Sequence, residues 1–301
     1  MPAKGIGISP YFKKAAAAAV TPSPLIAAWY AALSVKPSSA LLTSLNTLVN
    51  GMNTDGDWTE LDFFSLSAGM ETEEQALRPL KTTGNSVQTS VDFNGGVNFL
   101  PWTANGWATN GDGGILSGYN PFSNGVKYTL NSAFAAFYGN TRVNTSTTNS
   151  LCGGDYTTDE VSYFITTPSL NIVATSLSNG ASRGPNDNST NNSATKSKTS
   201  GDSNVPFYSG IKRTASNSKI AFINNINSAV LGIVSTGVPN GEFASVGTYS
   251  TNLISGNGGT AIGSGRLYAR ATIFGSGLVS QTNTGSRLNT FFQARGLNPY
   301  V

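Results

Sequence analysis

The first strong hydrophobic pattern in the chain predicts a helix that begins after Pro37. Ser38 supplies an N-terminal cap, and Gly51 supplies a residue suited to a helix end. Between them, apolar residues recur three and four positions apart: Leu41, Leu42, Leu45, Leu48 and Val49. This spacing gathers them on one face of a helix, so we expect the helix to pack against a core.

Two shorter helices are predicted mainly by their end signals. Thr72 and Gln75 have the spacing of a capping box, and Pro79 limits the helix that follows. Near the end of the chain, Ser286–Arg295 has apolar residues on one face and Gly296 as its stop. We therefore expect the helices of this chain to be few and short.

From about residue 80 onward the pattern is typical of short β-strands bounded by Gly, Asn, Ser or Pro clusters. The expected strands are Val97–Leu100, Tyr128–Tyr138, Val161–Thr166, Leu170–Ser176, Val205–Lys212, Lys219–Asn224, Ala229–Val234, Glu242–Val246 and Arg266–Phe274. Residues 178–204 carry almost no apolar side chain, so we expect a polar insertion or long loop there. The predicted fold class is mainly β, an antiparallel two-sheet sandwich with a few short helices.

Residues 1–37 are interpreted as an N-terminal extended arm, separate from a domain over residues 38–301. Gly and Pro residues punctuate the segment, with room between them for one or two helical turns at Ala15 to Ala19. An arm without a core of its own is either a disordered tail or a segment that lies on a neighbouring subunit. Its aromatic residues favour the second interpretation, an assembly anchor. They are Tyr11, Phe12, Trp29 and Tyr30.

Composition narrows the function classes that the chain can serve. Charged residues are 11% of the chain, against about 25% in an ordinary globular protein. The 18 Lys and Arg residues are scattered and the net charge is +3, so we expect no nucleic-acid partner. No run approaches the roughly 18 continuous apolar residues of a membrane span, so we expect no membrane insertion. The start of the chain resembles a signal peptide only vaguely, and we expect none to be cleaved.

The side chains that carry most catalysis and metal binding are almost missing from the sequence. The chain has no histidine, which removes the commonest general base and the commonest metal ligand together. Cys152 is its one cysteine, so neither an intrachain disulfide nor a cysteine-based zinc site can form. Two Asx-rich turns, at residues 53–57 and 110–114, lack the ligand spacing of a calcium loop. We therefore expect no enzyme, no cofactor and no metal site.

One short motif comes close to a catalytic pattern. Glu60 and Asp62 alternate with apolar residues, and Ser65 follows. The string resembles the signature of one large family of jelly-roll glucanases, in which three carboxylates alternate along a strand and two serve as nucleophile and general acid. Ser65 replaces the third carboxylate, so that mechanism cannot run as written. Our interpretation is a strand or helix edge that packs Leu61 and Phe63 inward.

A cluster of aromatic residues is the remaining functional material. A Gly- and Asn-rich stretch, which includes Asn120, contains five aromatic residues: Trp102, Trp107, Tyr119, Phe122 and Tyr128. Exposed Trp and Tyr rings beside amide side chains are typical of sugar-binding surfaces. The alternative is that these rings are core anchors of neighbouring strands. We keep Trp102, Trp107, Tyr119 and Asn120 as candidate glycan-binding residues.

Several landmarks occur in an order that resembles a known family. They are the Leu-rich helix, Leu48-Val49-Asn50-Gly51, Asp55-Gly56-Asp57-Trp58 with Leu61-Asp62, Glu74 with Ala76-Leu77, Gly106 with Asn110-Gly111, Gly118-Tyr119-Asn120-Pro121, Tyr128 with Asn131-Ser132-Ala133, Arg213-Thr214 with Asn217, and Phe274-Gly275-Ser276-Gly277-Leu278. Over about residues 38–296, the chain resembles the concanavalin A-like (laminin G-type) jelly-roll proteins of bacteriophages and prophages, notably those of Bacteroidetes hosts.

This resemblance implies a jelly-roll sandwich in a virion, on the tail, its fibres or the capsid surface. The expected partners are other copies of the chain and neighbouring virion proteins, in a symmetric homo-oligomer. The leading hypothesis is thus a non-enzymatic virion structural protein that assembles through its arm. The alternative is a lectin-like module that binds host-surface glycans. A third hypothesis is a degenerate glycan hydrolase that uses Glu60 and Asp62.

Overall fold

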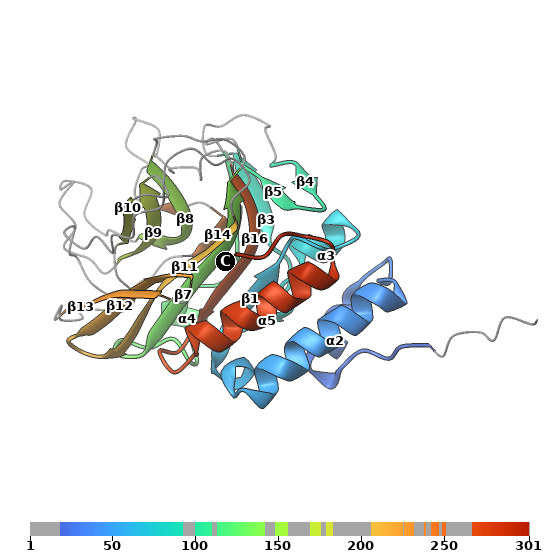
Figure 1. Ribbon diagram of the computed structural model, residues 1–301, viewed down its shortest axis with the longest axis horizontal. Helices are drawn as coiled ribbons and strands as arrows, with labels where there is room; N and C mark the ends of the chain where they lie inside the picture. Colours follow the sequence, from blue (N-terminus) through green and yellow to red (C-terminus); the bar gives the residue numbers. More distant parts are fainter. Residues whose placement is uncertain are drawn as a thin grey trace, which may run out of the picture.

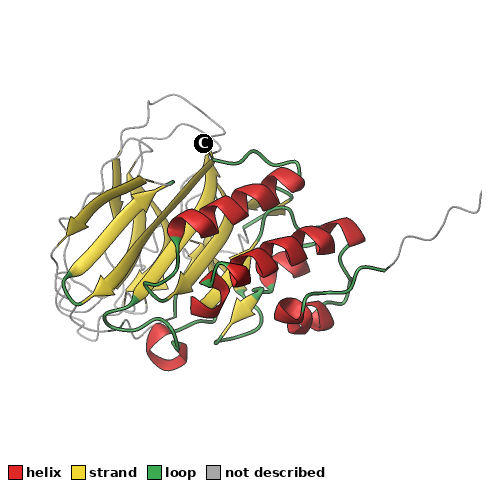
Figure 2. Cartoon of the chain, turned by 60° about the horizontal axis from the view of Figure 1, so that its bottom comes forward, coloured by secondary structure: helices red, strands yellow, loops and turns green. Residues whose placement is uncertain are grey.

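The computed structural model of the chain has three layers, two β-sheets and a layer of helices (Figures 1 and 2). It describes residues 19–92, 100–109, 113–141, 148–155, 169–175, 179–182, 206–224, 226–231, 238, 242–246, 249–250 and 267–300. The expected strand Val161–Thr166 lies outside the described residues, as does nearly all of Val97–Leu100. Most of the polar segment 178–204 also lies outside them, apart from the strand β10.

The larger sheet has nine strands, and its strand pairs are antiparallel. Their order is β13 (Ile226–Leu231), β12 (Ser218–Ile223), β11 (Pro206–Ala215), β7 (Ala133–Thr141), β16 (Leu267–Gly275), β1 (Leu61–Leu66) and β2 (Lys81–Thr82). In addition, β5 (Gly106–Ala108) pairs with β16, and β4 (Trp102–Thr103) pairs with β5. All six residues of β1 are buried, which places this strand at the centre of the fold. Residues far apart in the sequence therefore meet on β1.

The smaller sheet has seven strands. Their order is β10 (Asn179–Ser182), β9 (Ser169–Thr175), β8 (Thr148–Asp155), β14 (Ala244–Val246), β6 (Gly113–Leu116) and β3 (Thr89–Asp92), with β15 (Tyr249–Ser250) parallel to β8. The rings of Phe243, before β14, and Phe274 of β16 lie 5.1 Å apart, so the sheets share a core. The mainly β prediction is confirmed, and the jelly-roll connectivity stays a prediction.

The helices pack mainly on the other face of the larger sheet. They are η1 (Pro24–Ile26), α1 (Ala27–Ala32), α2 (Ser39–Thr54), η2 (Asp57–Glu60), α3 (Glu73–Leu77), α4 (Pro121–Asn124) and α5 (Gln281–Ala294). The long helices α2 and α5 lie side by side (Figure 1). The ring of Phe292 on α5 lies 4.6 Å from that of Tyr138 on β7, which fixes α5 to the sheet.

The start of α2 is as predicted, but its end is not. Ser38 caps the helix by accepting a hydrogen bond from the Leu41 N–H, and the apolar face is buried. The helix continues through Gly51 to Thr54, and Gly56 is the residue with positive φ, at 84°. A Cβ on Gly51 would lie 2.9 Å from the guanidinium of Arg287. Gly51 is therefore a close-approach site between α2 and α5.

The other two predicted helices are confirmed with changed bounds. Thr72 caps α3 through the N–H of Gln75, as the capping-box spacing indicates. The helix α5 begins at Gln281, because Ser280 accepts a hydrogen bond from the Asn283 N–H. Its first turn is polar, so the apolar pattern alone places the start too late. Its C-terminal stop at Gly296, with φ of 72°, agrees with the sequence.

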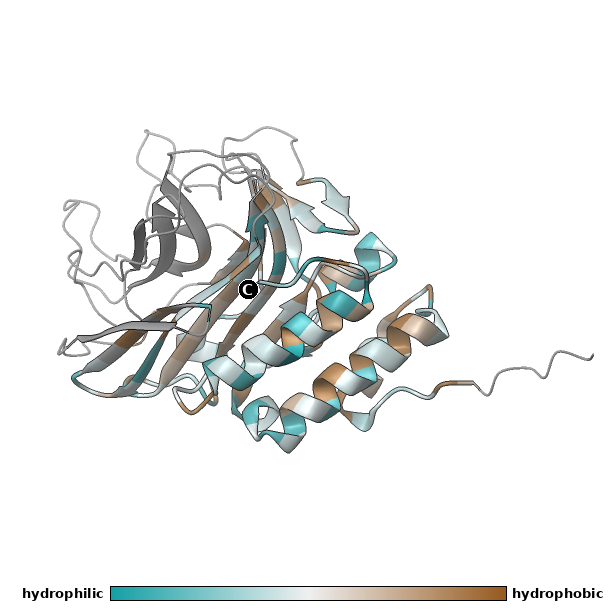
Figure 3. Cartoon of the chain, in the orientation of Figure 1, coloured by the Kyte–Doolittle hydropathy of each residue, from teal (hydrophilic) through white to brown (hydrophobic). Residues whose placement is uncertain are grey.

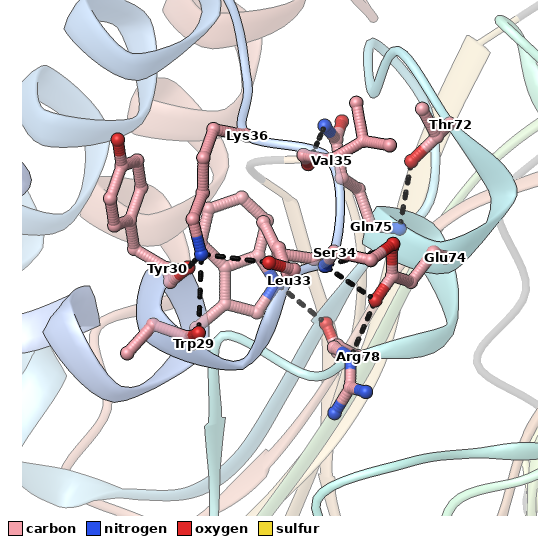
Figure 4. A network of polar contacts seen from close by, with 11 residues as sticks. Trp29, Tyr30, Leu33, Ser34, Val35, Lys36, Thr72, Glu74, Gln75 and Arg78 are labelled. Atoms are coloured by element: carbon pink, nitrogen blue, oxygen red, sulfur yellow. Dashed lines mark hydrogen bonds and ion pairs between the residues drawn. The ribbon is translucent and has the colours of Figure 1, made fainter.

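The second half of the expected arm packs on the chain itself (Figure 4). Ile26, Trp29 and Leu33 are buried in the core, and the Trp29 indole N–H donates to the Arg78 carbonyl at 3.1 Å. The Ser34 N–H donates to Glu74 at 3.0 Å, and Lys36 donates to the carbonyls that end α1. The boundary at residue 37 is therefore wrong, because this segment contributes to the core.

Tyr30 is also part of this folded segment, with the ammonium of Lys36 5.0 Å from the centre of its ring. Trp29 and Tyr30 are thus held by contacts within one copy of the chain, in contrast to their expected role as assembly contacts. Tyr11 and Phe12 lie outside the described residues. For residues 1–18, which also lie outside the described residues, the arm stays a prediction.

Candidate functional site

Asp62, the second residue of β1, is buried and serves as an acceptor for a distant loop. Its carboxylate accepts hydrogen bonds from the backbone N–H groups of Val126, Lys127 and Tyr128, at 2.8–3.0 Å. The hydroxyl of Tyr119 also donates to it, at 3.1 Å. Burial and this carboxylate raise the pKa of Tyr119 well above its usual value, so the phenol stays protonated. Asp62 therefore organises the segment 126–128.

Glu60 anchors a second loop beside the first. Its carboxylate accepts a hydrogen bond from the Ser276 hydroxyl at 2.6 Å, and the Lys127 ammonium lies 3.6 Å away. The backbone carbonyl of Glu60 also accepts from the Ser276 N–H, at 2.9 Å. The two carboxylates of the near-catalytic motif thus fix loops. The strand interpretation of that motif is confirmed, with Leu61 and Phe63 buried.

The two loops, residues 120–132 and 275–280, are also tied to each other. Asn120 caps α4 by accepting from the N–H groups of Phe122 and Ser123, at 2.9 and 3.4 Å. The Ser132 hydroxyl accepts from the Gly277 N–H at 3.0 Å. A Cβ on Gly277 would lie 1.8 Å from the Arg213 carbonyl oxygen, so this close approach requires glycine. Both loops are therefore held in defined conformations.

Four large apolar side chains project into solvent from these fixed loops. They are Phe122 (65% exposed), Val126 (67%), Leu130 (36%) and Leu278 (73%), which together we call the apolar rim. In the described part of the chain, only Val35 and Val87 are comparably exposed large apolar residues, and both lie outside the two loops. Figure 3 shows the hydrophobic colour on the loop between β16 and α5. The apolar rim is thus a concentration of exposed apolar surface.

The size and rigidity of the apolar rim are those of an interaction surface. From its exposed fractions, the four side chains present about 400 Å² of apolar surface, within the range of the largest patches on monomeric proteins, which are often functional. Hydrogen bonds to Asp62, Glu60 and Asn120 fix the backbone beneath them. A surface that is already ordered loses little conformational entropy when a partner binds.

The residues predicted to bind glycans do not form a surface cluster. Trp107 and Tyr119 are buried, and the Tyr119 ring lies between those of Phe63 and Phe274, at 6.2 and 5.8 Å. The glycan prediction is wrong for these two residues, because neither ring has a face open to a ligand. They are core anchors, which is the alternative that the sequence left open.

Trp102 and Asn120 also have structural roles. Trp102 is partly buried against the core, and its indole N–H donates to the Ser67 carbonyl at 2.9 Å. The Asn120 side-chain oxygen is used in the cap of α4. Density of aromatic residues in the sequence does not reveal which rings are exposed. Phe122 belongs to the same aromatic stretch and is exposed. Its position directly after Pro121, at the start of a capped turn, is the local signal that separates it from the buried rings.

Side chains of the Asx-rich turn at residues 53–57 link the end of α2 to α5 through hydrogen bonds. Asp55 pairs with Arg287 at 2.9 and 3.0 Å, and these hydrogen bonds lower the pKa of Asp55. Asp57 accepts from the Ser280 N–H and the Thr284 hydroxyl, and its burial raises its pKa. In the described ranges, no three His, Cys, Asp or Glu side chains lie close enough to hold a metal ion. No described helix is long and apolar enough to cross a membrane.

No protein-family model and no curated protein matches the chain. Solved structures that are similar include a Trypanosoma rangeli sialidase in complex with 2,3-difluorosialic acid, with a TM-score of 0.49, 10% identity and coverage of 84% of this chain and 38% of that chain. Domain 4 of an extracellular arabinanase from Geobacillus stearothermophilus, in complex with arabinotriose, has a TM-score of 0.47, 11% identity and coverage of 76% and 98%. The binding domain of botulinum neurotoxin serotype D has a TM-score of 0.48, 11% identity and coverage of 81% and 53%. This chain thus spans less than half of the sialidase, and at these TM-scores the likeness carries no argument about function.

Proposed function

We propose that this chain is a non-enzymatic structural protein of a virion, which joins its assembly through the apolar rim. The observation that carries the proposal is the exposure of Phe122, Val126 and Leu278 on loops fixed by a buried carboxylate. Rigid exposed apolar surface is typical of protein interfaces and costly to keep in water. The ordered sequence landmarks, which resemble those of phage jelly-roll proteins, support the virion setting.

The uses of the carboxylates support the non-enzymatic part of the proposal. General acid–base or nucleophilic work needs a carboxyl group that reaches a substrate. Asp62 instead is buried and accepts from four donors, and Glu60 is bound to Ser276. Assay of the full chain against β-glucans and related polysaccharides tests this directly. Hydrolysis that disappears in Glu60→Gln, while the variant keeps its fold, would overturn the non-enzymatic proposal.

The virion setting is tested by locating the chain. Particles are purified from a host that carries the gene, labelled with a gold-conjugated antibody against the chain, and imaged by electron microscopy. We expect labels at a regular position on the particle, with peptides of the chain in the particle's mass spectrum. A chain found in the cells but in no particle fraction would contradict the proposal.

The contribution of the apolar rim is tested by a matched pair of variants. Phe122→Ser with Leu278→Ser removes two rim side chains, whereas Val35→Ser with Val87→Ser removes two exposed apolar side chains elsewhere. All four positions are exposed, so both variants are expected to fold. We expect the rim pair alone to reduce the amount of chain recovered in particles. Equal recovery of both variants would refute a role for the rim.

Glycan binding is a second candidate function, and the exposed ring of Phe122 favours it. Ser123 and Asn124 lie beside that ring on α4, and an exposed aromatic face with polar neighbours suits a sugar. A glycan array probed with the full chain and with Phe122→Ala tests it. Binding that is lost in this variant supports the function, and no binding by the unmodified chain removes it. Trp107→Ala is unsuitable, because that ring is part of the core.

A further inference from the structure

We infer that the apolar rim binds residues 1–18 of a neighbouring copy of the same chain. The inference rests on the proposed function, because it names the partner of the rim in the assembly. It joins an exposed apolar surface to a segment whose sequence contains apolar and basic residues. The contact would link copies head to tail, with the donor segment and the receiving rim on different parts of the surface.

The area of the rim suits a short segment. A stable protein–protein interface buries about 800 Å² of polar and apolar surface on each partner. The rim supplies about 400 Å² of apolar surface, so a second globular face would also have to bury a similar area of polar neighbours. An extended peptide of 18 residues, in contrast, can place a few side chains on a small patch and bury them there. The rim therefore matches a peptide in scale.

Residues 1–18 have the composition that such a patch requires. Their large apolar residues include Ile6, Ile8, Tyr11 and Phe12. Gly5, Gly7 and Pro10 disfavour a helix across this stretch, so an extended conformation suits it. In an extended chain, residues two apart point to the same side, which puts Ile6 and Ile8 on one face. That face is apolar, as is the rim.

The charges of the two partners are complementary at part of the border. Residues 1–18 contain Lys4, Lys13 and Lys14, and no acidic residue precedes Asp55. Two carboxylates border the loops of the rim, and Lys127 is a cation within them. Glu60 lies 3.6 Å from Lys127, a loose pair, and Glu242 accepts from the Gly118 N–H at 2.6 Å, before the cap of α4. Opposite charges at the border of an apolar contact favour encounter and fix its register.

The base of the segment is fixed away from the rim. The Ser23 N–H donates to the Asn46 side-chain oxygen at 2.7 Å, and the Asn46 amide donates to the Thr21 carbonyl at 2.8 Å. The described chain therefore starts along α2, at the opposite side of the molecule from α4 (Figure 1). Eighteen extended residues span at most about 60 Å. Such a length bridges readily from one copy to the rim of the next.

Cross-linking between isotopically distinct copies tests the inference with the full chain. p-Benzoylphenylalanine is placed at Phe12, and this protein is mixed with unmodified chain labelled with nitrogen-15. After irradiation, mass spectrometry identifies which residues of the heavy copy are joined to position 12. We expect light–heavy cross-links within residues 120–132 or 275–280. Cross-links only within one copy, or to other regions of the heavy copy, would overturn the inference.

Two variants of the receiving surface complete the test. Phe122→Ser with Leu278→Ser should weaken self-association in analytical ultracentrifugation by about tenfold or more, because each side chain loses buried apolar area. Val35→Ser with Val87→Ser should leave it unchanged. A rim variant that is lost from particles while position 12 cross-links elsewhere would overturn the inference and leave the proposed function standing. Unchanged particle incorporation by the rim variant would remove both.

Discussion

Replacement of Asp62 by Asn should destabilise the fold far more than a surface substitution would. The carboxylate receives three backbone N–H groups and a phenol hydroxyl in a buried position. An amide offers one oxygen, and its NH₂ group would face donors. Each buried N–H left without an acceptor costs about 1–3 kcal/mol. All four donors contact Oδ2 and only the Lys127 N–H also contacts Oδ1, so the amide group takes one acceptor from Lys127 and the uncharged oxygen binds the other donors less strongly. We therefore expect Asp62→Asn to lower the free energy of unfolding by about 2–3 kcal/mol.

Urea denaturation followed by circular dichroism measures this change. Glu60→Gln is the matched control, because Glu60 is partly exposed and an amide can still accept from Ser276. We expect its loss to be about 1 kcal/mol or less. Hydrogen exchange adds a local measure, since the N–H groups of residues 126–128 should lose protection in Asp62→Asn alone. Equal unfolding free energies in the two variants would refute the structural role of Asp62.

Three further predictions concern the core, the glycine contact and pH. Trp107→Ala should lower the free energy of unfolding by about 3–5 kcal/mol, because the ring is buried in the core. Trp102→Ala, at a partly buried ring, should lower it by clearly less. A reversed order in urea denaturation would contradict the assignment of Trp107 to the core. Gly277→Ala should cost about 1–3 kcal/mol in the same assay, because its Cβ would lie 1.8 Å from a backbone oxygen, and no loss would contradict that contact. Burial raises the pKa of Asp57 above 3.8, so the folded state binds the proton more tightly than the unfolded state does. The stabilising contribution of the protonated form is present below pH 3.8 and is lost as the pH rises through the folded-state pKa. Asp57→Asn should therefore flatten this part of the curve of unfolding free energy against pH. An unchanged slope in the variant would contradict the raised pKa of Asp57.

The local parts of the fold are the parts that the sequence predicts well. Ser38, Thr72 and Gly296 act through neighbours a few positions away, and the structure confirms all three. Gly51 instead lies within α2, at a point where Arg287 of another helix approaches it closely. A capping signal can be identified from adjacent residues, whereas a close approach between helices requires the tertiary packing.

The sequence contains a helical pattern in the folded part of the expected arm, but the nearby prolines point to an extended segment. Ile26, Trp29 and Leu33 are spaced three and four apart, which is typical of one helical face, and all three are buried. The surrounding prolines favoured an extended interpretation. In the structure Pro24 lies in the first turn of η1, where its missing N–H costs nothing. Prolines at this position mark where a helix starts, and they are compatible with a core contact directly after them.

The directions in which Glu60 and Asp62 point could not be predicted from the neighbouring residues, because they depend on the geometry of the strand. A pair of carboxylates two residues apart shares one face only if the strand is regular. Here Glu60 ends the short helix η2, and the register of β1 against β16 shifts between Leu61 and Phe63. The irregularity turns Asp62 toward a loop more than sixty residues later and leaves Glu60 beside Ser276. Alternating carboxylates that would serve catalysis on a regular strand thus serve here to hold two loops. Because the carboxylates hold the loops, we expect the exposed residues of those loops, Phe122 and Leu278, to make the contacts of the proposed function.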